Sequence, residues 1–357
     1  MSISQRISQA RKLRGLSLRA VGERAQLSHE AVRKYEVGAD LPSSGVLLRL
    51  AAALEVPPAY FFRSATVGEI QPVFRKKKAL TQAQLLRVEA EIRDRVERYL
   101  ELESIRLPEA EPRALPEDFP VAVGSFDEVE SAAERLRDAW QLGRDPIENL
   151  TDLLEEQAIK VVAIAGVDGF DACTFEVTHD GLKSVVIAVR ADLPGDRHRF
   201  NLGHELAHRL LAVGPALDEE KAANRFAGAF LAPRERVLAE LGAQRQSLGL
   251  VELHLLKHKY GMSMQAWIYR AKDLGVLGED VAARQFRSFR ANGWHRAEPG
   301  DALPTEEPGR FRRLILQAVE EQQISRQRAS ELLAQPFEDF IAAVAREHNG
   351  LVAAVGG

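Results

Sequence analysis

Residues 204–208 read His-Glu-Leu-Ala-His, and this motif constrains the surrounding fold more than any other part of the sequence. On an α-helix, residues i and i+4 lie one above the other, so both imidazoles can reach a single metal ion. Residues 197–211 show helical spacing of apolar side chains and contain no proline, which predicts such a helix. Glu205 lies beside the histidines, where it can accept a proton from a water on the metal. The motif therefore predicts a metal site at His204 and His208 with Glu205 as general base; the competing interpretation is two surface histidines on an ordinary helix.

A catalytic zinc site of this kind needs a third protein ligand and an open fourth position. After a turn at Val213-Gly214-Pro215, residues 217–233 predict an amphipathic helix whose first turn carries Asp218, Glu219 and Glu220. A carboxylate in this turn can fold back onto the first helix, although acids at this position also suit a helix N-terminus. By spacing alone, Glu219 and Glu220 are equivalent candidates for the third ligand.

The pattern along the chain predicts a mainly α-helical protein with a small β-sheet, which is an α+β fold class. Val- and Ile-rich runs predict strands at 159–165, 174–178 and 184–189. Proline- and glycine-rich breaks predict four parts: residues 1–62, a linker and amphipathic helix at 63–126, a central domain at 127–290, and a helical unit at 291–357. The amphipathic helix at 80–104 suits a dimerisation element and an intramolecular brace equally well. In the last part, Ser325 is expected to begin a helix, and we interpret this unit as a packing or partner-recognition element.

Charge is distributed unevenly along this 357-residue chain, although its net charge is only −4. Residues 1–78 hold 14 Lys and Arg against 6 Asp and Glu, and residues 79–357 hold 34 against 46. A basic N-terminal part predicts a polyanionic partner for that part.

No apolar run approaches the roughly 20 residues of a membrane helix, so we expect no transmembrane span. The single cysteine, Cys173, excludes an internal disulfide and fits a reducing cytoplasm.

The stretch RFNLGHELAHRLL, followed by EEKAANRFAGAFLAP, resembles the core of the ImmA/IrrE-type zinc metallopeptidases. Their second helix reads roughly E-x-x-A-N-x-F-A-x-x-L-x-x-P, and matching Ala223-Asn224 and Phe226-Ala227 to this pattern places the leading glutamate at Glu220. The resemblance implies that His204, His208 and Glu220 hold Zn²⁺ in a zincin-like domain, with Glu205 as the general base. It covers about residues 145–280. Two departures, Ala207 and Ala232, stand where glycine and methionine are frequent, and neither position supplies chemistry.

Residues 1–62 predict five short helices, with a distinctive set of residues at Arg11, Gly15, Ser17, Ser28, Val32, Tyr35-Glu36, Gly38, Pro42, Leu50-Ala51, Leu54 and Val56-Pro57. In these residues the segment resembles the phage-repressor-like, or XRE, helix-turn-helix family. In this family the third helix enters the major groove. The resemblance therefore implies that Ser28, His29, Glu30, Arg33 and Lys34 face the DNA, and that Arg11, Lys12, Arg14 and Arg19 contact phosphates. Leu18 stands where glutamine is frequent, so one common contact is absent.

Together the two resemblances imply a cytoplasmic transcriptional regulator that binds a double-stranded DNA operator and carries a zinc endopeptidase. Its expected substrate is a cognate repressor or co-encoded partner in stress-response, mobile-element or toxin–antitoxin regulation. The alternative is a transcription factor or antitoxin whose zinc or ligand site is sensory and cleaves little. Retention of Glu205 favours catalysis, because a sensor does not need the base. Family members usually bind DNA as dimers, so a homodimer is a further expectation.

Overall fold

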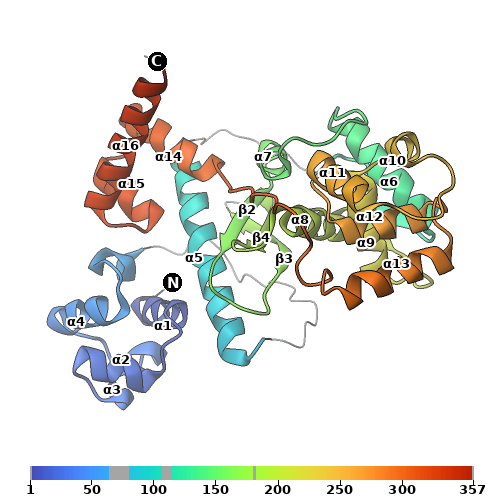
Figure 1. Cartoon of the computed structure of the whole chain (residues 1–357). Coiled ribbons are helices and arrows are strands. Elements are labelled where there is room, and N and C mark those ends of the chain that lie inside the picture. The colour runs from blue at the N-terminus through green and yellow to red at the C-terminus, as the bar shows by residue number, and fades with distance from the viewer. Residues whose placement is uncertain (1, 64–79, 107–114, 180–181, 356–357) are drawn as a thin grey trace. The chain divides into compact units, whose positions relative to one another are not determined.

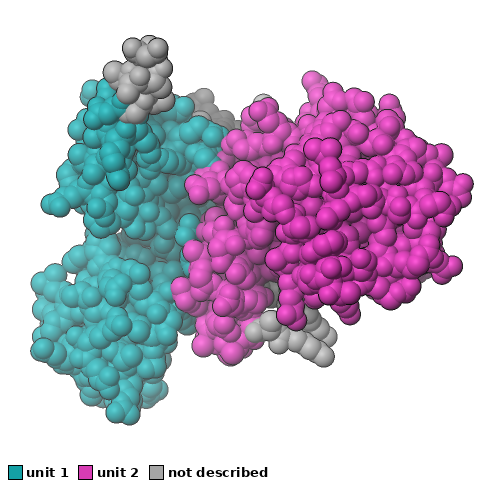
Figure 2. All heavy atoms as spheres, in the orientation of Figure 1, with its two compact units in different colours: residues 1–69, 89–111, 309–357 teal, residues 70–88, 112–308 magenta. Residues whose placement is uncertain are grey.

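The computed structural model describes residues 2–63, 80–106, 115–179 and 182–355 (Figure 1). The chain forms two compact units, which Figure 2 shows in different colours. Unit 1 comprises residues 1–69, 89–111 and 309–357, and unit 2 comprises residues 70–88 and 112–308. Helices dominate and the strands are few, which confirms the α+β class. Within the described ranges, no helix has the length and apolar character needed to cross a membrane. Four consecutive basic residues at 75–78, Arg-Lys-Lys-Lys, lie outside the described residues.

The N-terminal part of unit 1, which we call the head, is built from short helices whose ends are fixed by local side chains. They are α1 (Ile3–Leu13), α2 (Leu18–Ala25), α3 (His29–Val37), α4 (Ser44–Leu54) and the 3₁₀ helix η1 (Pro58–Phe62). Ser17, Ser28 and Ser43 are N-caps whose hydroxyls accept a hydrogen bond from the backbone N–H three residues later. Gly38 ends α3 with a φ of 73°. The predicted set of five short helices is confirmed, with a 3₁₀ helix as the fifth.

The turn between α2 and α3 passes very close to Gly22. A Cβ atom at Gly22 would lie 2.7 Å from the carbonyl oxygen of Leu27. We expect Gly22→Ala to destabilise the head by about 1–3 kcal/mol, because the turn has to shift to admit the methyl group. Calorimetric melting of the full chain measures the effect.

The matched control is Gly45→Ala in α4, where a Cβ atom would meet nothing within 4 Å. This substitution is expected to stabilise the head by about 0.4–1 kcal/mol, because alanine loses less conformational freedom on folding than glycine does. Equal effects of the two substitutions would contradict the close approach at Gly22.

The long helix α5 (Gln82–Arg106) connects the head with the C-terminal helices inside unit 1. On the head side, buried Arg6 pairs with buried Glu97, and Arg63 Nη1 lies 3.1 Å from Asp94 Oδ1. On the other side, the apolar part of α5 packs against α14 (Arg310–Glu320), α15 (Arg326–Leu333) and α16 (Phe337–Val355). Tyr99 stacks on Phe311 with ring centroids 5.1 Å apart. Residues 89–106 therefore act as an intramolecular brace, one of the two roles expected for this helix. Ser325 is the N-cap of α15, as predicted.

Unit 2 contains a three-stranded sheet of order β2-β4-β3, formed by Lys160–Ile164, Leu182–Arg190 and Ala172–His179. β2 pairs parallel to β4, and β3 pairs antiparallel to it, with Ile187 opposite both Val161 and Thr174. All three strands were predicted. A second, parallel pair of strands, β1 (Val121–Val123) and β5 (Leu211–Val213), was not predicted.

The remaining helices of unit 2 surround one apolar core that includes one face of the three-stranded sheet. Their bounds are α6 (Phe126–Ala139), α7 (Leu150–Glu156), α8 (Gly195–Leu210), α9 (Glu219–Leu231), α10 (Arg234–Leu241), α11 (Leu250–Tyr260), α12 (Met264–Asp273) and α13 (Glu279–Ala291). Leu206 of α8, Phe226 of α9 and Trp267 of α12 are all fully buried in this core. Because their inner sides are held in one core, α8 and α9 have a fixed mutual orientation.

Candidate metal centre and DNA-binding surface

Helices α8 and α9 approach each other closely at a pair of small residues. A Cβ atom at Gly203 would lie 3.3 Å from the Cβ of Ala227, so only glycine fits at this point without displacing its neighbour. The connection between the two helices is also fixed. The strand β5 follows α8 directly, and Gly214 donates a backbone hydrogen bond of 2.8 Å to Val123. These contacts return the chain so that the first turn of α9 lies beside the C-terminal half of α8, where Glu220 comes within 3.6 Å of both His204 and His208.

Three potential ligands converge where these helices meet. His204 and His208 of α8 and Glu220 of α9 form a group whose ligand atoms all lie within 4.8 Å of one another. The two imidazole Nε2 atoms are 3.1 Å apart. His204 Nε2 lies 3.5 Å from Glu220 Oε2, and His208 Nε2 lies 3.6 Å from Glu220 Oε1.

These distances fit a tetrahedral zinc site. Two ligands placed 2.0–2.1 Å from zinc in tetrahedral geometry stand about 3.3–3.4 Å apart. The spacings of 3.1, 3.5 and 3.6 Å scatter closely around that value. Two imidazoles and one carboxylate are also a known ligand set of catalytic zinc. The residues present therefore suit this metal.

A second ring of contacts orients the two histidines. His204 Nδ1 lies 3.0 Å from Asn224 Oδ1. Because this amide oxygen accepts a hydrogen bond, it favours the His204 tautomer that carries its proton on Nδ1. In that tautomer the lone pair on His204 Nε2 is available to a metal ion on the side of Glu220. Asn224 follows Glu220 by four residues, so α9 presents both side chains on the same face. Glu219 Oε1 lies 3.7 Å from His208 Nδ1. Hence the structure separates the two acids that spacing left equivalent: Glu220 faces both Nε2 atoms, and Glu219 faces the opposite side of the His208 ring.

Exposure differs along the cluster in a way that suits a site open on one side. The His208 side chain is 3 % exposed and the His204 side chain is 16 % exposed, whereas Glu220 is 56 % exposed. Glu205 is half-buried and follows His204 directly on α8. The histidines are thus held within the domain while the carboxylate side of the cluster faces solvent.

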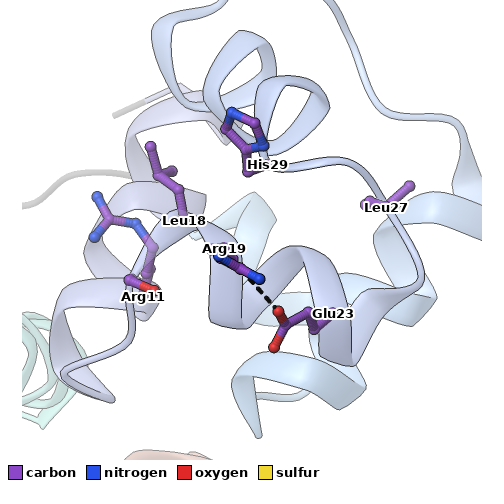
Figure 3. A pocket seen from close by; sticks show the side chains of 7 residues that line it. Arg11, Leu18, Arg19, Glu23, Leu27 and His29 are labelled. Carbon is purple, nitrogen blue, oxygen red and sulfur yellow. Dashed lines mark hydrogen bonds and ion pairs between the residues drawn. The ribbon is translucent and has the colours of Figure 1, made fainter.

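In the head, α2 and α3 form a helix-turn-helix, and a shallow hollow lies at its surface (Figure 3). Its lining includes Leu18 and Arg19 of α2 and His29 of α3. Arg19 is highly exposed and pairs with Glu23. Of the residues expected to face DNA, His29, Arg33 and Lys34 are exposed, and the Ser28 hydroxyl is used as the N-cap of α3.

Glu30 and Arg33, one helical turn apart on α3, form an ion pair on the surface. The hydrogen bond from Arg33 holds the pKa of Glu30 below its usual value. Both side chains are about half exposed. The pair is therefore ionised at neutral pH and accessible, with each member able to exchange its partner for a base edge or a phosphate.

Three of the expected phosphate-contacting residues have partners or partial burial inside unit 1. Arg11 makes a bidentate pair with Glu36 and donates to the carbonyl of Leu16, and only 19 % of its side chain is exposed. Arg14 donates to the carbonyl of Leu54 at the end of α4. Lys12 is half-buried. Arg11 and Arg14 thus make contacts that hold parts of the head together. Their positive charge in the sequence predicted only contacts with phosphates.

Comparison with known proteins agrees with both resemblances. Residues 7–61 match a helix-turn-helix family model, and residues 167–272 match the model of the IrrE N-terminal-like domain. Two similar proteins are uncharacterized HTH-type transcriptional regulators of Sinorhizobium fredii, y4aM and y4wC. The first is 38% identical over 60 residues, which is 17% of this chain and 42% of the relative. The second is 37% identical over 69 residues, which is 19% of this chain and 48% of the relative. The chain thus matches less than half the length of these relatives.

Proposed function

We propose that this chain, which joins an XRE-type helix-turn-helix domain to an IrrE N-terminal-like domain, is a DNA-binding transcriptional regulator with a zinc-dependent endopeptidase activity. The observation that supports the enzymatic part most strongly is the convergence of His204, His208 and Glu220 beside Glu205. A purely sensory site needs the ligands alone. The general base next to them supports hydrolysis.

In this proposal, some residues bind the metal and another transfers a proton. His204 and His208 would bind zinc through Nε2, and Glu220 through a carboxylate oxygen, with Asn224 keeping the His204 ring in register. Bound zinc supplies a Lewis acid for the scissile carbonyl and lowers the pKa of a water to about 7. Glu205 accepts the proton that the attacking water releases and then donates it to the leaving amine nitrogen.

The proposed substrate is a cognate repressor or co-encoded partner protein, and the proposed nucleic-acid ligand is the double-stranded operator of the chain's own promoter region. His29, Arg33 and Lys34 are the exposed residues of α3 that suit contact with DNA. Arg19, at the start of α2, suits a phosphate contact beside them. Cleavage of the repressor would change transcription from the promoter to which the head binds.

Zinc removal tests the enzymatic part. The full-length chain is expected to carry about one zinc per chain and to cleave a repressor encoded beside it, since one three-ligand cluster is present in the described residues. A zinc chelator is expected to stop cleavage, and added zinc to restore it, as followed by mass spectrometry of the products. As a control, the variant with Glu30, Arg33 and Lys34 changed to alanine should lose promoter binding and keep its zinc.

Two outcomes would contradict the proposal. If the chain purified without a chelator contained no zinc, the three converging side chains would not form a zinc site. Promoter binding that responds to zinc while every candidate partner stays uncut would instead establish the sensory alternative.

A further inference from the structure

Unit 2 carries a dense group of arginines at α13 and just beyond it. Arg284, Arg287 and Arg290 lie on α13, and Arg296 follows its C-terminus; we call these four residues the α13 basic surface. All four side chains are exposed. The segment 284–296 contains no Asp or Glu. The group stands out because residues 79–357 carry an excess of acidic residues.

Ion pairing sets this surface apart from most other arginines of the same unit. Throughout the ranges that the structure describes, no carboxylate lies within ion-pair distance of any of the four arginines. By contrast, the exposed side chains of Arg135, Arg234 and Arg236 each pair with an aspartate. Positive charge that no carboxylate of the described residues neutralises favours an anionic partner.

The packing of α13 fixes the direction of these arginines. Ala282 and Phe289 are buried, and the Phe289 ring lies against Trp294 with centroids 5.4 Å apart. Since residues three apart on a helix differ by about 60° in direction and 4.5 Å in height, Arg284, Arg287 and Arg290 spread over one outward face. The favourable effect of a helix C-terminus on cations accounts for Arg290 in the last turn, but not for Arg284 and Arg287.

The chemistry of this face favours a phosphate backbone over an acidic polypeptide. Guanidinium groups bind phosphate oxygens with two parallel hydrogen bonds, and duplex DNA offers about one negative charge per 1.7 Å of its axis. A specific protein interface needs a buried apolar or aromatic anchor at its centre. The outward positions of α13 between Arg284 and Arg290 are Arg287 and Ser288, which provide no such anchor. Tyr269 of α12, an exposed aromatic residue beside the helix, already uses part of its ring for contact with Phe286, whose centroid lies 4.3 Å away.

We propose that the α13 basic surface binds the phosphate backbone of double-stranded DNA without regard to sequence, as a contact separate from the head. The proposal requires neither zinc nor peptidase activity. Binding by the head raises the concentration of DNA that this surface encounters, so even weak phosphate contacts add to the overall affinity. Each phosphate neutralised releases counterions, which makes the contribution measurable as salt dependence.

The test uses the full chain with Arg284, Arg287 and Arg290 changed to glutamine, which keeps a good helix former at each position. The probes are a fluorescent duplex of the chain's own promoter region and a scrambled duplex of the same length and composition. We expect affinity for both duplexes to fall by the same factor, on the order of 10-fold at 0.1 M salt, and the slope of log affinity against log salt to shrink by about 2–3. Tryptophan fluorescence checks the fold, because Trp294 packs directly behind the helix.

The matched control changes Arg135, Arg234 and Arg236 to glutamine, which removes the same charge from the same unit where each arginine already has an aspartate partner. This control should keep DNA affinity within about 2-fold of the wild type, because paired surface arginines offer little free charge. Wild-type affinity and slope in the α13 variant would overturn the proposal. So would unchanged DNA binding together with lost binding of poly-glutamate, which would assign the surface to an acidic polypeptide.

Discussion

A Glu205→Gln substitution is expected to slow cleavage of the partner protein by about 10²–10⁴-fold while the chain keeps its zinc. Glutamine has nearly the same shape as glutamate but cannot accept the proton of the attacking water. Glu205 is not among the three converging ligands, so those ligands should still bind zinc after the change. Product formation by mass spectrometry and zinc content by elemental analysis measure the two effects separately. Wild-type cleavage by this variant would remove Glu205 from the mechanism.

Two neighbouring glutamates provide the controls for this experiment. Glu220→Gln removes the carboxylate that faces both Nε2 atoms, and zinc content is expected to fall with it. Glu219→Gln changes a carboxylate on the Nδ1 side of His208, and most of the zinc should remain. Loss of zinc in the Glu219 variant, with zinc retained in the Glu220 variant, would mean that the ligand assignment is reversed.

Most helices and strands could be predicted because their signals are local. Ser17, Ser28 and Ser43 mark helix starts through hydrogen bonds to residues three positions away. The two short strands β1 and β5 were missed for the opposite reason. Val121–Val123 and Leu211–Val213 are far apart in the chain and have three residues each. Such a pairing depends on tertiary contacts that bring the backbones together, and neither segment is long enough to show a periodic pattern.

The proposed metal ligands also differ in how far local sequence could predict them. His204 and His208 could be paired from the sequence because four residues make one helical turn. The third ligand could not be chosen this way, since Glu219 and Glu220 differ by about 100° in direction on α9. How α9 crosses α8 decides between them, and the contact of Gly203 with Ala227 sets that crossing. The resemblance pointed to Glu220, and in the structure this residue lies nearest to both Nε2 atoms.

Glu130→Gln is expected to destabilise unit 2 by about 3–5 kcal/mol, because it removes the charge that two buried arginines share. Glu130 of α6 is 3 % exposed and pairs with Arg225 of α9 and Arg270 of α12, so one carboxylate joins three helices. Arg225 also pairs with Asp273 at 3.3 Å, and Arg270 donates to the carbonyl of Ala232. These extra partners hold the guanidinium groups in place, so they cannot move to solvent when the carboxylate is lost.

Denaturant unfolding followed by tryptophan fluorescence measures this loss in unit 2 alone, because all three tryptophans, Trp140, Trp267 and Trp294, belong to that unit. The control is Asp138→Asn on the same helix, which breaks an exposed pair with Arg144 and should cost far less stability than Glu130→Gln. A similar cost for both substitutions would contradict the role of burial.

The pH dependence of the Glu130 effect follows from its pKa. Burial alone would raise that pKa, but the hydrogen bonds and charges of Arg270 and Arg225 outweigh burial and hold it below the usual value of a glutamate. A depressed pKa means that the stabilisation is fully present above the unfolded value of about 4.3 and is lost as the pH falls through the lower folded value. The difference in unfolding free energy between wild type and Glu130→Gln should therefore stay constant from pH 7 to about pH 5 and shrink below about pH 4. A difference that does not change with pH over this range would mean that shape, and not the charge of Glu130, holds the three helices together.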